Sequence, residues 1–158
     1  MSENEVIGKV FPKISAYSLA KTEVKLPDMV KGKIALIAVA FVREAQEMID
    51  SWAMPFEKKF SGNINYAYYE VPMIDGIWKL FRGSIDGGMR AGIPMEKHMK
   101  VLTYYGNYKE YIRYLLIDNI NIGYVFLLDK EGIIKFKGIG YASDKDLSYM
   151  LEMANKLD

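Results

Sequence analysis

The residues best suited to catalysis or metal binding are a few acidic side chains and one histidine. Glu44, Glu47 and Asp50 fall on one side of a predicted helix start, where paired carboxylates can exchange protons or hold a cation. Acidic residues in a first helical turn more commonly stabilise the helix through its dipole, and that is our preferred interpretation. His98 is the chain's single histidine and lies two residues after Glu96, so no histidine pair is present to bind zinc. We therefore expect no metal site and no cofactor.

The sequence contains no cysteine. A cysteine thiolate is the reacting group in thiol–disulfide exchange and in thiol-based peroxide reduction, so we expect neither activity and favour a function other than catalysis. A glycine-rich stretch, residues 83–92, includes Arg90 but lacks the Gly-Lys-Ser/Thr sequence of a phosphate-binding loop. We expect this stretch to be a mobile loop, and the alternative is a lid over a binding groove.

Length and composition are those of one globular domain spanning residues 1–158. The chain is 51% hydrophobic and 26% charged with a net charge of +1, which gives no general attraction to nucleic acid or to an anionic membrane. The longest nearly uniform apolar run, residues 34–42, is too short to cross a bilayer. The first five residues are largely polar and no hydrophobic signal segment follows them. We therefore expect a cytoplasmic protein that does not insert directly into membranes.

A strand–helix–strand unit is predicted in the first half of the chain. Residues 34–41 are apolar at every position, which is typical of a strand covered on both faces of a parallel sheet. Residues 43–60 carry apolar side chains at three- and four-residue steps, which predicts an amphipathic helix that Pro55 should kink. Residues 65–73 form a second predicted strand that ends at Pro72. The connection between two such parallel strands is right-handed in almost all proteins.

The remaining segments predict an α/β fold with a central mixed sheet. Residues 123–128 and 133–137 flank a tight turn ending at Gly132, a strong hairpin signal because glycine readily takes a positive φ. Ser143 is expected to cap a helix that runs to about Leu157. The glycines within residues 76–92 weaken the helical pattern there. The other expected elements are strands at 14–19, 24–26 and 99–105 and a helix at 108–117.

The order of these motifs resembles the peroxiredoxin-type proteins of the thioredoxin-like group. The resemblance begins with the run Val6 to Pro12 and includes Lys31-Gly32-Lys33 before the central strand. It implies a thioredoxin-like fold with helices on both faces of the sheet. Such proteins carry two cysteines at the start of the helix after the central strand and a cis-proline before the hairpin. Here the cysteine positions fall on Glu47 and Asp50 or on Gln46 and Ile49, and Gly123 takes the place of the proline.

The last part of the chain resembles one family more specifically. The runs Gly123 to Asp129 and Gly132 to Ala142 are similar to the end of the mitochondrial ATP synthase assembly factor called ATPase complex subunit ten. This chain has Phe136 where that family usually has tryptophan. Weaker similarity occurs at Ser51-Trp52, Pro55-Phe56, Glu70-Val71-Pro72, Met89-Arg90, and Ile93-Pro94 with His98. The resemblance implies a non-redox, chaperone-like role on a client that belongs to a membrane complex.

We therefore hypothesise a binding protein that holds a protein or peptide client in the vacated redox site. The predicted groove has three walls: the helix start at 43–47, the loop at Gly123 and the segment 83–94. Its backbone at Gly123 is expected to be open, because the proline ring is missing. The alternative is a cysteine-independent enzyme that uses the helix carboxylates with Arg90 and His98 in the same groove. The candidate binding residues are Arg43, Gln46, Glu47, Arg90, His98, Gly123 and Tyr124. No nucleic-acid partner is expected, and the sequence does not indicate an oligomeric state.

Overall fold

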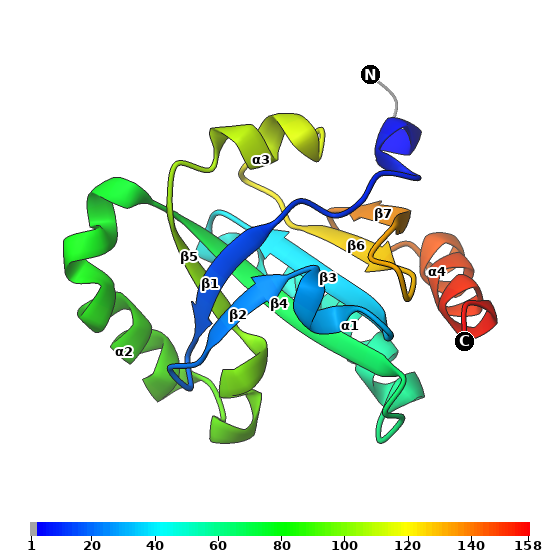
Figure 1. The fold of residues 1–158 in the computed structure, drawn as a ribbon, viewed down its shortest axis with the longest axis horizontal. Coiled ribbons are helices and arrows are strands. Elements are labelled where there is room, and N and C mark those ends of the chain that lie inside the picture. The colour runs from blue at the N-terminus through cyan, green and yellow to red at the C-terminus, as the bar shows by residue number, and fades with distance from the viewer. Residues whose placement is uncertain (1–2) are drawn as a thin grey trace.

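The computed structural model describes residues 3–158, which form a seven-stranded mixed sheet with the strand order β2-β1-β5-β4-β3-β6-β7 (Figure 1). Strand β4 pairs in parallel with both β3 and β5, whereas the outer pairs are antiparallel. The strands are β1 (Ile14–Ser18), β2 (Glu23–Leu26), β3 (Ile34–Ala40), β4 (Tyr66–Asp75), β5 (Leu102–Gly106), β6 (Tyr124–Leu128) and β7 (Ile134–Ile139). The α-helices are α1 (Gln46–Phe60), α2 (Arg82–Gly92), α3 (Lys109–Tyr114) and α4 (Asp144–Lys156). Short 3-10 segments include η1 (Glu3–Val6), η2 (Asp28–Val30), η3 (Arg43–Ala45), η4 (Gly76–Phe81) and η5 (Met95–Lys100).

Two apolar layers enclose the sheet. On one face, α1 and α4 pack against the side chains of alternate β3 residues, beginning with Ile34. On the other face, α3 and the chain before β1 cover the intervening β3 residues, beginning with Ala35. All seven residues of β3 are buried, which confirms the prediction of a strand covered on both faces. The expected thioredoxin-like arrangement, a mixed sheet with helices on both faces, is confirmed.

Several local predictions are confirmed by the backbone. The hairpin between β6 and β7 turns at Gly132, whose φ is 81°. The Ser143 hydroxyl accepts a hydrogen bond from the Asp146 amide at 3.1 Å and caps α4. Helix α1 continues through Pro55 without interruption, and its expected kink stays a prediction. Strand β4 does not end at Pro72 but runs on to Asp75, because β3 pairs with it only as far as Pro72 and β5 pairs with its last three residues.

The glycine-rich segment is not the mobile loop that the sequence predicted. Most of it forms α2, and a tertiary contact explains the helix. Asp86 is buried and accepts hydrogen bonds from the Tyr105 hydroxyl at 2.7 Å and from the Thr103 hydroxyl at 3.1 Å. These bonds fix α2 on β5 and stabilise a helix that its glycines disfavour. Figure 1 shows α2 and α4 at opposite ends of the long axis of the molecule.

Trp52 connects α1 to the β6–β7 hairpin. Its ring is 2% exposed, and its indole N–H donates a hydrogen bond to the carbonyl oxygen of Gly140 at 2.8 Å. A Cβ on Gly138 would lie 2.7 Å from Cζ2 of this ring, so only glycine leaves room for it. The inward packing that the apolar stripe predicted for Trp52 and Phe56 is confirmed.

We expect Trp52→Ala to lower the free energy of unfolding by about 3–5 kcal/mol, because it leaves a large cavity and an unpaired Gly140 carbonyl. Urea denaturation followed by circular dichroism measures the loss. Trp78, the chain's other tryptophan, is 49% exposed and provides the control. Trp78→Ala should cost less than about 1 kcal/mol, and equal losses in the two variants would contradict the packing described.

Candidate functional site

The first turn of α1 presents exposed polar side chains where the redox pair of the resembled proteins would lie. Arg43, Gln46 and Glu47 are all exposed and follow the carboxyl end of β3, the edge at which α/β sheets generally bind ligands. The Gln46 amide donates a hydrogen bond to Oδ1 of Asp50 at 2.9 Å. Oε2 of Glu47 accepts a hydrogen bond from the Tyr141 hydroxyl at 3.2 Å. Three of the predicted binding residues therefore lie together.

A buried carboxyl group on β4, which the sequence analysis did not single out, faces α1. Glu70 is only 8% exposed and accepts a hydrogen bond from Gln46. Burial raises the pKa of this carboxyl to about 7, and the charges of Asp50 and Glu57 contribute in the same direction. The Gln46 hydrogen bond and the charge of Lys97 lower the pKa and partly oppose that shift. A glutamate on the inward face of a strand is the sequence signal that could have identified it.

The arrangement around Glu70 can hold a polar group and exchange a proton near neutral pH. The Gln46 amide hydrogen-bonds Asp50 and lowers the pKa of Glu70 through a side-chain hydrogen bond. In the described part of the chain, no group of three or more metal-ligating side chains could hold a metal ion.

Gly123 lies beside this helix start, but its backbone is not open. A Cβ built on Gly123 would lie 2.9 Å from Cγ1 of Ile49 and 3.3 Å from the carbonyl oxygen of Ala45. The glycine is needed because α1 packs directly on the start of β6. The predicted approach of the helix start and Gly123 is confirmed, whereas the expectation of an accessible strand-pairing site at Gly123 is wrong.

Tyr124 does not line the same surface. Its side chain is 2% exposed and packs in the layer on the α3 side of the sheet. The Tyr124 hydroxyl donates a hydrogen bond to the Asn119 carbonyl at 3.1 Å and accepts one from the Asn119 amide at 3.0 Å. Tyr124 therefore fixes the loop before β6 and is not placed to touch a client at the helix start.

Arg90 and His98 lie beside the amino end of β5 and next to Leu19. Leu19 receives a hydrogen bond from Arg90 at 3.5 Å, and its amide donates to the carbonyls of His98 and Val101. The strands are staggered, so the amino end of β5 is level with Val71 of β4 and with Val39 near the carboxyl end of β3. Gly123 precedes β6, which β4 and β3 separate from β5 in the sheet. No hydrogen bond among the described residues joins Arg90 or His98 to Gly123 or to residues 43–47, and the predicted convergence of segment 83–94 with the helix start stays a prediction.

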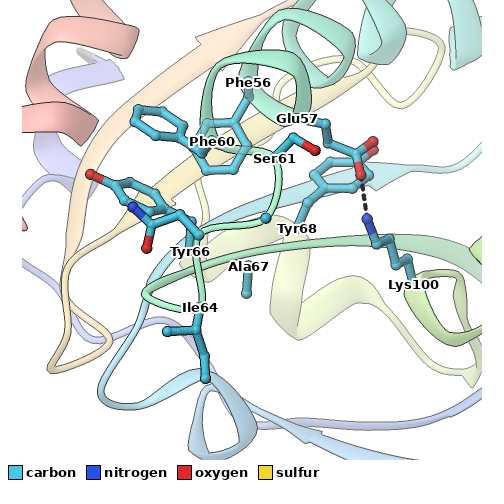
Figure 2. Close-up of a pocket in the computed structure, with 11 residues that line it drawn as sticks. Phe56, Glu57, Phe60, Ser61, Ile64, Tyr66, Ala67, Tyr68 and Lys100 are labelled. Atoms are coloured by element: carbon cyan, nitrogen blue, oxygen red, sulfur yellow. Dashed lines mark hydrogen bonds and ion pairs between the residues drawn. The ribbon is translucent and has the colours of Figure 1, made fainter.

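A cavity of about 370 Å³ lies near the other end of α1 (Figure 2). Phe60 and Tyr66 form one wall with parallel rings whose centroids are 3.9 Å apart. Glu57 and Lys100 form an ion pair at the opposite side. The sequence did not indicate this cavity, because its aromatic residues follow the same pattern as ordinary core residues.

Comparison with known proteins agrees with this geometry. The family model described as ATP10 protein matches residues 7–157. The chain belongs to the ATP10 protein family. A search of curated proteins finds no significant match.

Solved structures similar to this ATP10 family member include thiol–disulfide proteins. A putative protein disulfide isomerase from Bacteroides thetaiotaomicron has a TM-score of 0.66 and 14% identity, over 96% of this chain and 89% of that chain. A putative thiol:disulfide interchange protein DsbE from Chlorobium tepidum has a TM-score of 0.64 and 14% identity, over 96% of this chain and 98% of that chain. At such identities the likeness shows a thioredoxin-like fold. This chain keeps that fold without a cysteine.

We expect Gly123→Ala to lower the free energy of unfolding by about 1–3 kcal/mol, because the new methyl group overlaps Ile49 and the backbone of α1. Thermal or urea denaturation measures the change. Gly88 offers a matched control, since it lies within α2 and nothing lies within 4 Å of a Cβ built on it. Gly88→Ala should be neutral or stabilise by up to about 1 kcal/mol. A neutral Gly123→Ala would contradict the close approach.

We expect the buried Glu70 to make the protein less stable as pH rises. Because the pKa of Glu70 is raised from 4.5 to about 7, the carboxyl group stays protonated in the folded state over this pH range, whereas the unfolded state has released the proton. Glutamine does not titrate, so the free energy of unfolding of Glu70→Gln minus that of the native protein should increase with pH. The increase from about pH 5 to about pH 8 should be on the order of 3 kcal/mol.

Urea denaturation of both proteins at the two pH values tests this prediction. Glu44→Gln is the control, because Glu44 is an exposed carboxylate in the turn before α1. Its stability difference from the native protein should be the same at both pH values. A pH-independent difference for Glu70→Gln would show that Glu70 does not hold a proton in the folded state.

Proposed function

We propose that this chain is a non-redox binding protein that holds a subunit of a membrane complex during assembly, with ATP synthase as the complex. The observation that carries the proposal is the family match over residues 7–157 in a chain without cysteine. The family's short name, ATP-synt_10, refers to ATP synthase. A thioredoxin-like fold that lacks a thiolate can still bind an extended or apolar polypeptide at the edge where the redox pair would lie.

An exposed apolar segment at this edge supports a hydrophobic client. Segment η4 follows the carboxyl end of β4, and α1 follows the carboxyl end of the parallel strand β3. Within η4, Leu80 is 94% exposed and Ile77 is 75% exposed, and both aromatic side chains are about half exposed. Consecutive exposed apolar residues on a protein surface usually mark an interaction site. We propose that η4 and the start of α1 together contact the client.

The proposed client is a segment of a membrane protein. No helix among residues 3–158 combines the length and apolar content needed to cross a membrane. A cytoplasmic location is part of the proposal and rests on the sequence pattern alone.

Co-purification from the native cell tests the proposal. We expect the tagged native protein to retain subunits of a membrane complex after mild detergent extraction. Leu80→Asp should reduce their recovery about tenfold, because a charge in place of an anchoring apolar side chain disrupts a binding surface at little cost to the fold.

Ile64→Asp is the matched control. Ile64 is 80% exposed and precedes β4, so it lies at the opposite edge of the sheet from Leu80. Recovery with Ile64→Asp should equal that of the native protein. Recovery that is unaffected by Leu80→Asp, or that falls equally in both variants, would contradict the proposed surface.

A further inference from the structure

A small basic cavity lies between α2 and the turn that joins β1 to β2. Its volume is about 250 Å³. Helix α2, which forms one wall of the cavity, lies at the far end of the molecule from α4 (Figure 1). The lining shares no residue with the candidate site at α1. Its lining consists of Tyr17, Ser18, Lys21, Arg82, Gly83, Asp86 and Arg90. Three cations and one carboxylate give this lining a net charge of +2.

The single carboxylate of the cavity is already fully engaged. Asp86 accepts the hydrogen bonds from Thr103 and Tyr105, and Nε of Arg82 lies 3.7 Å from its Oδ2. The Arg82 guanidinium is held in place by two rings, 4.7 Å from the centroid of Tyr17 and 5.0 Å from that of Tyr105. Asp86 and Arg82 therefore balance each other, and the positive charge of the cavity comes from the other two cations.

Arg90 is the cation that most needs an acceptor. Its side chain is half-buried, and a single long hydrogen bond, 3.5 Å from Nη1 to the Leu19 carbonyl, is its contact with an acceptor in the described part of the chain. Arginine has five N–H donors in a planar fork that matches two oxygens of a phosphate or carboxylate. No carboxylate of the described residues forms an ion pair with it.

Lys21 adds a second charge from the opposite wall and adopts a strained conformation. Its φ of 66° lies in the left-handed region, which is unfavourable for a residue with a Cβ. Its amide donates to the Ser18 carbonyl at 2.8 Å and closes the turn. Glycine would occupy this turn without strain, so a lysine here indicates that the side chain serves a purpose other than the turn.

We propose that this cavity binds a phosphate group between Arg90 and Lys21. A phosphate monoester carries a charge close to −2 at neutral pH, which matches the net charge of the lining, and its oxygens suit the guanidinium fork. The phosphate belongs either to a small soluble molecule or to a lipid headgroup, and the two sources are distinguished by experiment.

The first experiment measures thermal unfolding of the full chain while inorganic phosphate is added, with sodium chloride at matched ionic strength as the reference. We expect the melting temperature to rise with phosphate and not with chloride, since only the native state has the site. Arg90→Gln should weaken the phosphate response about tenfold or more. Lys79→Gln removes an exposed cation of η4 that does not line the cavity, and its response should equal that of the native protein.

Lys21→Gly separates binding from folding. This variant should melt at a higher temperature without phosphate, because glycine relieves the strained φ, and should respond less to phosphate because a charge is lost. A higher melting temperature with an unchanged phosphate response would exclude Lys21 from the site.

Vesicles test the lipid source. Phosphatidylcholine vesicles with and without phosphatidic acid are sedimented with the native protein and with Arg90→Gln. Sedimentation that requires both phosphatidic acid and Arg90 identifies a lipid headgroup as the source, whereas an Arg90-dependent response to inorganic phosphate alone identifies a soluble one. The proposal is overturned if neither inorganic phosphate nor phosphatidic acid distinguishes Arg90→Gln from the native protein.

Discussion

Strand β3 is buried along its whole length and on both faces, and the rest of the molecule is arranged around that constraint. Every residue from Ile34 to Ala40 is apolar, since an unpaired polar side chain at this depth would be strongly destabilising. Parallel and antiparallel partners satisfy its backbone, and helices cover both of its faces. Apart from Glu70 inside β4, the polar side chains of the candidate site therefore follow the end of a strand.

The close packing of α1 determines which residues reach the surface. Gly123 allows the helix to approach β6, and Gly138 makes room for the ring of Trp52. These two contacts fix the rotation of α1, so Ile49 faces inward while Gln46 and Glu47 remain exposed. The same rotation brings Gln46 against Glu70. A buried carboxyl group whose pKa is raised to about 7 therefore lies beside the first turns of α1.

The fold could be predicted from the sequence wherever a local pattern and the tertiary structure agree. The apolar run at 34–40, the stripe along α1, the Gly132 turn and the Ser143 cap are of this kind. Helix α2 could not be predicted, because its glycines oppose a helix and the buried contact of Asp86 with β5 overrides them.

The candidate site was predicted only in part, because strand order decides which distant residues meet. Arg43, Gln46 and Glu47 lie together after β3, as their place after a recognisable strand predicted, and their role in binding stays a prediction. Arg90 and His98 were expected beside Gly123, but they lie along β5, which β4 and β3 separate from β6, and no local pattern shows this strand order. Glu70 contributes its charge from a strand interior, where a single sequence gives little indication of burial.

The central claim is that this thioredoxin-like chain works by holding a client at the edge formed by the start of α1. The most direct test replaces Glu47 with a photoreactive amino acid in the native cell and identifies the crosslinked protein by mass spectrometry. The same replacement at Ile64, on the opposite edge, serves as the reference. Crosslinks from position 47, and not from position 64, to a subunit of a membrane complex are the predicted result. Crosslinks from position 64 alone, or none from either position in cells that contain the assembled complex, would contradict the claim.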